Sequence, residues 1–250
     1  MTYLMAIDDT DMPDTPGTGW LVQELTEIFT RNGWAACSTI SRHQLYVHED
    51  VPYTSHNSAM CFELSLLGCD EQKLVDYTCS FLEERHVRGS DPGFCLAVKE
   101  DANAGQLLMA FGSRAKSEVI PISDAYDTAE AAGVHLSEHG GTGQGVIGAL
   151  AAIGLRLNGN DGRYRGWYHF GRPGDIVTVS DLCGHDFVDV VATPDGEVLS
   201  VQEPVSIGSE KTKTVRIGHR QVILAVTQGC NGTPHQTRYR TITQVEAKSY

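Results

Sequence analysis

Two hydrophobic periods alternate along the first 170 residues, one typical of strands and one typical of helices. Residues 3–7 are an apolar run that predicts a buried strand. From 18 to 32 the apolar residues recur at helical spacing, and Gly33 follows at the position where a glycine ends a helix. The same reasoning predicts strands over 60–66 and 94–99, extended chain over 35–47, and helices over 71–87, 122–132 and 146–153. Strands and helices that alternate in this way predict a two-layer α/β (α+β) domain.

The pattern changes after Gly171-Arg172-Pro173-Gly174. Short apolar runs typical of strands follow, separated by turn signals such as Pro194-Asp195-Gly196; they span 176–179, 187–191, 198–201, 214–217 and 222–226. We therefore expect two parts, an α/β domain over residues 1–172 and an all-β module over 173–250. The module is a small barrel or sheet, either separate or continuing the first sheet.

Charge is distributed unevenly along the 250 residues. The net charge of −13 argues against general affinity for nucleic acids, because phosphate binding depends on Lys and Arg. Residues 205–250, however, hold seven basic and two acidic side chains, a net charge of +5. This asymmetry predicts that the C-terminal part faces either an anionic partner or the acidic remainder of the chain.

Cysteines and hydropathy indicate the compartment. The seven cysteines are scattered, odd in number and never spaced as CxxC, which argues against a disulfide framework and a cysteine-based zinc site. No apolar run is long enough to cross a membrane, and the acidic N-terminal segment does not resemble a signal peptide. We expect a cytoplasmic protein with reduced thiols.

Three carboxylates follow the first strand, at Asp8, Asp9 and Asp11. Their mutual repulsion favours a hard divalent cation, and Mg²⁺ uses one or two carboxylates while keeping positions for water and phosphates. Thr18 then lies between two glycines at the start of the predicted helix, where backbone N–H groups can bind phosphate. The alternative interpretation is a solvated turn with Thr18 as the N-cap residue.

A glycine-rich loop over 137–145 is the second chemical signal. Its glycines let the backbone approach a ligand closely, and the helix that follows directs its positive end at the loop. No Lys-Ser/Thr pair follows, so this is not a P-loop. His139 is a candidate to contact phosphate or a leaving group.

These segments resemble the kinase-like domain of the archaeal tRNA-isoleucine agmatinylcytidine synthetase family. The resemblance extends from residue 3 to about 170, and we find none after about 172. It depends on four segments: Ile7-Asp8-Asp9-Thr10-Asp11; Val51-Pro52-Tyr53 with Asn57 and Ala59; Asp91-Pro92-Gly93; and Gly145-Val146-Ile147-Gly148-Ala149-Leu150-Ala151-Ala152-Ile153-Gly154.

The resemblance implies a domain that uses ATP and Mg²⁺ to phosphorylate a cytidine. On this basis Asp8, Asp9 and Asp11 are candidates to bind metal and phosphate, and Thr18 is the candidate phospho-acceptor. The nucleotide would be lined by Arg42, Tyr53, Asn57, Gly141, Thr142, Gly143 and Gly145.

The chain also departs from the family. Thr54, His56 and Gln144 stand where the family has basic residues, which predicts weaker phosphate binding or a different way of holding the phosphates. We find no counterpart of the family's tRNA-recognising domains, including its zinc ribbon.

Three hypotheses follow. The first is a Mg²⁺- and ATP-dependent phosphotransferase or ligase whose acceptor is a small molecule, or an RNA bound through the basic C-terminal module. The second is a nucleotide- or metabolite-binding module without turnover. The third is a tRNA-modifying subunit that needs a partner chain to bind RNA.

Overall fold

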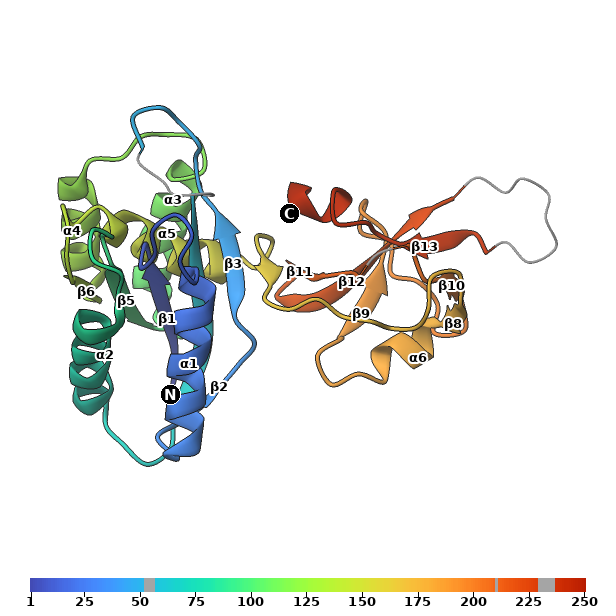
Figure 1. Ribbon diagram of the computed structural model, residues 1–250, viewed down its shortest axis with the longest axis horizontal. Helices are drawn as coiled ribbons and strands as arrows, with labels where there is room; N and C mark the ends of the chain where they lie inside the picture. Colours follow the sequence, from blue (N-terminus) through green and yellow to red (C-terminus); the bar gives the residue numbers. More distant parts are fainter. Residues whose placement is uncertain (52–56, 210, 229–236) are drawn as a thin grey trace. The chain divides into compact units, whose positions relative to one another are not determined.

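The computed structural model describes residues 1–51, 57–209, 211–228 and 237–250. The chain divides into two compact units, unit 1 over Met1–Asn158 and unit 2 over Gly159–Tyr250 (Figure 1). The division predicted after residue 172 falls 14 residues further along, inside unit 2. The predicted domain boundary after residue 172 therefore stays a prediction.

Unit 1 is built on one antiparallel sheet. Its strands follow the order β6-β5-β1-β4-β3, and β2 also pairs with β4. β1 lies in the middle because its pairings place it between β4 and β5. The strands are β1 (Thr2–Asp8), β2 (Ala35–Cys37), β3 (Ser41–Gln44), β4 (Ser58–Leu66), β5 (Gly93–Val98) and β6 (His135–Glu138).

Helices cover both faces of this sheet (Figure 1). Alternate residues of β1 enter different cores: Met5 packs with helices α1 and α2, while Leu4 packs with α3, α4 and α5. Unit 1 therefore has three layers, and the predicted two-layer arrangement is wrong. The helices are α1 (Thr18–Arg31), α2 (Glu71–Arg85), α3 (Ala102–Arg114), α4 (Ile122–Ala132) and α5 (Gly145–Asn158).

Local signals explain where most helices begin and end. The Asp70 side chain accepts a hydrogen bond from the Lys73 N–H at 2.8 Å, the expected cap of α2. Gly33 has φ of 65° just past α1, as its predicted role requires. The sequence patterns did not predict α3, although Asp101 caps it by accepting from the N–H groups of Asn103 and Ala104.

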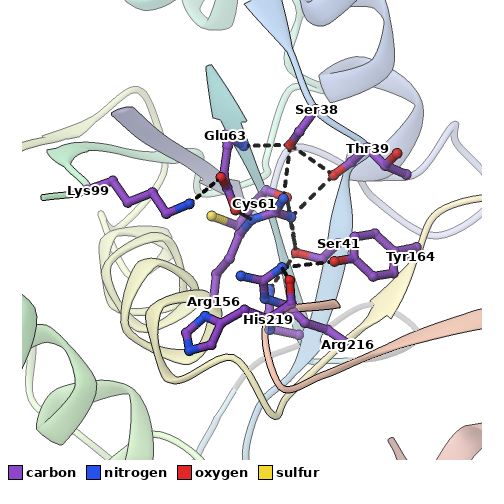
Figure 2. A network of polar contacts seen from close by, with 11 residues as sticks. Ser38, Thr39, Ser41, Cys61, Glu63, Lys99, Arg156, Tyr164, Arg216 and His219 are labelled. Carbon is purple, nitrogen blue, oxygen red and sulfur yellow. Dashed lines mark hydrogen bonds and ion pairs between the residues drawn. The ribbon is translucent and has the colours of Figure 1, made fainter. Parts of the chain in front are cut away.

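A buried arginine organises the C-terminal end of α5 (Figure 2). Arg156 is 2% exposed, and its guanidinium donates to the carbonyl oxygens of Thr39 and Cys61 and to the hydroxyls of Ser38 and Ser41. Its Nε lies 3.5 Å from a carboxylate oxygen of Glu63, which also pairs with Lys99 at 2.6 Å. The charge is thus surrounded by acceptors from β3, β4 and the chain before β3.

Unit 2 is rich in strands but is not all-β. Its strand order is β7-β11-β12-β13-β10-β8, and β9 runs parallel to β12. The bounds are β7 (Arg163–Tyr164), β8 (Ile176–Thr178), β9 (Val190–Ala192), β10 (Pro204–Ser206), β11 (Thr214–Ile217), β12 (Arg220–Thr227), β13 (Tyr239–Thr241), helix α6 (Val179–Cys183) and a final 3₁₀ turn, Glu246–Ser249.

Two details of unit 2 correct the sequence patterns. Thr178 and Asp181 form a capping box that starts α6, a helix that the apolar runs did not predict. The predicted strand at 198–201 is reduced to a single bridge between Ala192 and Val198. Inside unit 2, buried Arg216 donates to the Tyr164 hydroxyl at 2.9 Å (Figure 2).

Within the described residues, no helix combines the length and apolar character needed to cross a membrane. The six cysteines described there are not joined in disulfide bonds.

Candidate active site

The acidic cluster lies where β1 ends. Asp8 is the last residue of the strand and only 9% exposed, because the central strand carries it into the protein. Asp9 follows with a left-handed φ of 51°, an uncommon conformation that asparagine and aspartate tolerate best among residues with a Cβ. The backbone therefore turns sharply while two neighbouring carboxylates remain near each other.

Asp11 ties this turn to the first residue of α1. One of its carboxylate oxygens accepts from both the Thr18 backbone N–H at 3.1 Å and the Thr18 hydroxyl at 2.8 Å. The Thr18 hydroxyl also accepts from the Thr10 N–H at 3.2 Å. Gly17, and not Thr18, is the N-cap residue of α1, so the interpretation of Thr18 as a simple N-cap is wrong.

Burial and like charges raise the pKa values of two carboxyls. The pKa of Asp8 rises to about 8, first because of burial and then because of the neighbouring Asp9. The pKa of Asp9 rises to about 6, again first because of burial and then because of Asp91 and Asp11. Ionisation of both groups at neutral pH is therefore unfavourable until a positive charge is bound.

The first turn of α5 lies against Asp8. A Cβ atom at Gly148 would overlap the Asp8 carboxylate, so only a glycine lets the helix come this close. The positive end of the helix is consequently directed at the acidic cluster. Gly145, the first residue of α5, packs against the backbone of Asp91 and Gly93 in the same way.

An open cleft of about 790 Å³, its mouth included, borders the acidic cluster. Its described lining combines apolar residues with five acidic ones, Asp50 and Glu118 in addition to the three aspartates. Among the described residues that line it there is no Lys or Arg. The apolar lining is Leu45, Val51, Ala115, Val119, Ile120 and Ile147.

The structure brings together some of the predicted site residues and separates others. Those that line the cleft are Asp8, Asp9, Asp11, Thr18, Asn57 and Gly145. Arg42 does not line the cleft, but its Nε donates a hydrogen bond at 2.8 Å to the hydroxyl of Ser58, which is a lining residue. Tyr53 lies outside the described residues, as do Thr54 and His56.

The glycine-rich loop packs against carboxylates of unit 1, and its assignment to the nucleotide stays a prediction. Gly141, Thr142 and Gly143 do not line the cleft. The Thr142 hydroxyl donates to Asp91 at 2.6 Å, and the Thr142 N–H also donates to that carboxylate. A Cβ at Gly143 would overlap Glu138. These glycines thus allow the loop to close on carboxylates of its own unit.

Sequence patterns missed several lining residues. Four of them, Ala115, Glu118, Val119 and Ile120, lie in the segment that follows α3, the helix that was not predicted. Tyr46 and Asn57 are joined by a bond from the Asn57 amide to the Tyr46 carbonyl at 2.6 Å. The glycine spacing in α5 was the available signal for Gly148.

A magnesium ion fits this site only with ligands from a substrate. Within the described part of the chain, no three His, Cys, Asp or Glu side chains are arranged to hold a metal ion by themselves. One oxygen of Asp11 is also engaged by Thr18. Asp8 and Asp9 remain as two crowded carboxylates, the number that Mg²⁺ uses when phosphates and water complete its shell. The assignment of all three aspartates as metal ligands stays a prediction.

No protein-family model matches the chain, and neither does any curated protein. Solved structures do match it. A complex of TiaS with an isoleucine tRNA and ATP is 25% identical with a TM-score of 0.54, and the match covers 62% of this chain and 36% of that chain.

Two further structures agree. Apo TiaS, a tRNA agmatidine synthetase, is 25% identical at a TM-score of 0.52, covering 62% of this chain and 35% of its own. A tRNA fluorescent labelling enzyme is 25% identical with a TM-score of 0.53, and the match covers 62% of this chain and 36% of that chain. The resemblance predicted from the sequence is confirmed: over 62% of its length the chain is similar to TiaS, and it spans about 36% of the TiaS chain.

Proposed function

We propose that unit 1 binds ATP with Mg²⁺ in the acidic cleft and transfers a phosphoryl group, as an ATP-dependent transferase or ligase in RNA modification. One observation supports this most directly: Asp8, Asp9 and the Asp11–Thr18 pair line one cleft together with the first turn of α5, which packs against Asp8. The similarity to TiaS, which has been solved with ATP and an isoleucine tRNA, supports the choice of ATP and of RNA.

In this proposal Asp8 and Asp9 hold Mg²⁺, which would neutralise charge on the phosphates when bound. Both carboxylates would then be ionised, because a cation offsets the repulsion that raises their pKa values. The apolar residues of the lining would contact the base, and Asn57, whose amide donates to the Tyr46 carbonyl, lines the same cleft.

Thr18 is proposed as the acceptor of the γ-phosphoryl group. Its hydroxyl donates to Asp11 at 2.8 Å, so that carboxylate can take the proton as the Thr18 oxygen attacks phosphorus. The new O–P bond replaces the bond to the β,γ-bridging oxygen, and ADP leaves. A later transfer to the final acceptor would restore the hydroxyl.

The cleft lining favours one alternative, a nucleotide-binding module without turnover. The described lining offers no Lys or Arg to stabilise transferring phosphate. Binding through Mg²⁺ alone would then hold ATP without promoting transfer. A small-molecule acceptor, or an RNA held with the help of a partner chain, remains compatible with the same site.

The test is incubation with Mg²⁺ and γ-labelled ATP for wild type, Thr18→Ala and Thr30→Ala. Thr30 is a matched control because it is an exposed threonine on the same helix. We expect label on wild type and Thr30→Ala and none on Thr18→Ala, although the lost hydrogen bonds cost only about 1–2 kcal/mol of stability.

Label retained on Thr18→Ala would contradict the acceptor assignment. Folded wild-type protein that binds Mg·ATP without label or phosphate release, with RNA present, would favour the binding module. Absence of nucleotide binding would contradict the whole proposal.

A further inference from the structure

Unit 2 carries an aromatic and basic surface that the proposed ATP site does not use. Tyr168 and Thr212 exchange two backbone hydrogen bonds, at 3.0 and 3.2 Å, in an antiparallel bridge. Register then places Trp167 opposite Lys213 and His169 opposite Lys211. Because side chains alternate, these four share the face that Tyr168 and Thr212 do not occupy. We name the four residues the Trp167 patch.

The patch is open to solvent. Trp167 is 43% exposed, and the Lys213 ammonium lies 4.3 Å from the centre of its ring. His169 and Lys211 are also exposed. An exposed tryptophan with a lysine held over its ring presents both an aromatic surface and a positive charge.

The strand beneath the patch is well supported. On the opposite face Tyr168 stacks on Phe187, with ring centres 4.1 Å apart and planes inclined by 20°. Phe170 packs beside both rings. This aromatic cluster fixes the segment that carries Trp167 and His169, so little ordering is needed when a ligand binds.

A hollow adjoins the patch at His169 and Lys211, and its lining also includes Tyr168, Phe170 and Thr212 of the opposite face. No acidic residue is among the described residues that line it. His169 and Lys211 belong to its lining, together with Gly171 and Gly208. Asp175 lies beside Gly171, but its carboxylate accepts a hydrogen bond from the Arg172 N–H at 2.7 Å. Lys211 and Lys213 are the charged side chains of the patch.

We propose that the Trp167 patch binds single-stranded RNA, with a base stacked on Trp167 and phosphates beside Lys211 and Lys213. An aromatic ring flanked by lysines is the combination that binds single strands with little sequence preference. Unit 1, with nine basic and 22 acidic residues, repels RNA, whereas unit 2, with ten of each, does not. The choice of RNA over DNA rests on the proposed function.

The test is binding of a fluorescent single-stranded RNA of about 12 nucleotides to the full-length chain, without ATP and over a range of salt. The variants are Trp167→Ala, Trp167→Phe and the pair Lys211→Gln/Lys213→Gln. Two controls are matched: Trp20→Ala removes a tryptophan 51% exposed on unit 1, and Lys73→Gln removes a lysine 4.4 Å from the Trp34 ring.

We expect Trp167→Ala to weaken binding between about 5-fold and 150-fold, with Trp167→Phe intermediate. The double lysine change should lower the salt slope by about 1.4, because two phosphate contacts on a single strand are lost. Neither control should change affinity. Binding should be retained in Thr18→Ala, which separates this inference from the proposed ATP chemistry.

Equal affinities for Trp167→Ala and Trp20→Ala would overturn the proposal. So would competition by poly-glutamate as effective as that by unlabelled RNA, since it would indicate a site for acidic protein segments. Tighter binding of a duplex than of the single strand would exclude stacking on Trp167.

Discussion

The two ends of helix α5 each lie beside a buried charge, and the two charges are accommodated in opposite ways. Arg156, in the last turns, is enclosed by carbonyl, hydroxyl and carboxylate oxygens (Figure 2). Asp8, which lies against the first turn, is buried near the carboxylates of Asp9 and Asp11, and burial first and these charges second raise its pKa to about 8. Both are almost fully buried, at 2% and 9% exposure.

This difference in surroundings indicates a structural role for the charge of Arg156 and a functional role for that of Asp8. A buried ion that is fully paired has no further ligand to attract, and its removal leaves its partners unsatisfied. A buried ion among like charges raises the energy of the folded state until a cation binds. The comparison therefore predicts opposite stability changes when each charge is removed.

The largest expected effect follows from Arg156→Met. Loss of the guanidinium leaves buried oxygens of Ser41 and Cys61 without its hydrogen bonds, and we expect a loss of about 3–5 kcal/mol in the free energy of unfolding. Arg114→Met is the control, because Arg114 forms its ion pairs on the surface, where they contribute under about 1 kcal/mol. Urea denaturation measures both, and equal losses would mean that the network in Figure 2 is not structural.

Asp8→Asn should change stability in the other direction. The folded-state pKa of about 8 exceeds the unfolded value of 3.8, so the folded protein gains a proton and its stability falls as pH rises from about 4 to 8. Without Mg²⁺ at pH 8, we expect the variant to be more stable than wild type by on the order of 2 kcal/mol.

Thermal unfolding at pH 5 and pH 8 checks this prediction, and the gain should appear at pH 8. Saturating Mg·ATP should raise the melting temperature of wild type and leave that of Asp8→Asn unchanged. A variant less stable than wild type at both pH values would mean that Asp8, like Arg156, has a structural role.

Gly148→Ala tests the contact between α5 and Asp8. Alanine normally stabilises a helix relative to glycine by about 1 kcal/mol, but here its Cβ would overlap the Asp8 carboxylate. We expect a net loss of about 1–2 kcal/mol and weaker nucleotide binding. Gly105→Ala in α3 is the control, since nothing lies within 4 Å of its Cβ position, and it should be neutral or stabilising.

The sequence predicted most of unit 1 because its signals are local. The spacing of apolar residues predicted α1, and Asp70 predicted the start of α2, because helix spacing and N-caps both depend on residues close in sequence. The Asp8–Asp11 turn and Thr18 were predicted as one site, and they do lie together at the cleft. Strand β1 ends beside the start of α1, so proximity in the chain was enough.

The remaining features depend on contacts between distant segments. Arg156 meets Thr39 from 117 positions away, and no periodicity in the sequence indicates that pairing. The glycines of the 137–145 loop looked like a phosphate cradle, yet Gly141 and Gly143 make room for Asp91 and Glu138. A glycine pattern indicates close approach of the backbone without indicating what approaches it.

His135 and His139, in and just after β6, are a third set of titratable groups to compare with Arg156 and Asp8, and we expect the smallest effect there. The Ser137 hydroxyl lies 2.9 Å from His135 Nε2 and 2.8 Å from His139 Nε2, so one hydroxyl joins two rings. Burial lowers the pKa of both histidines, although Glu83, 3.8 Å from His139 Nδ1, opposes this for His139. Here a half-buried titratable pair remains neutral because burial disfavours its charged form, whereas Arg156 carries a charge surrounded by oxygen acceptors.

Because the folded-state pKa values lie below the unfolded value of about 6.5, the contribution of these histidines is complete above that pH. It is lost as pH falls through about 6.5 and below, since the unfolded chain then binds more protons. We expect thermal stability to fall between pH 7.5 and 5.5 in wild type and to fall less in His135→Gln/His139→Gln, whereas Ser137→Ala should retain the wild-type slope at a lower stability. An identical slope in the double variant would mean that folding does not shift the pKa of either ring, and the histidines would then not form a third, neutral arrangement.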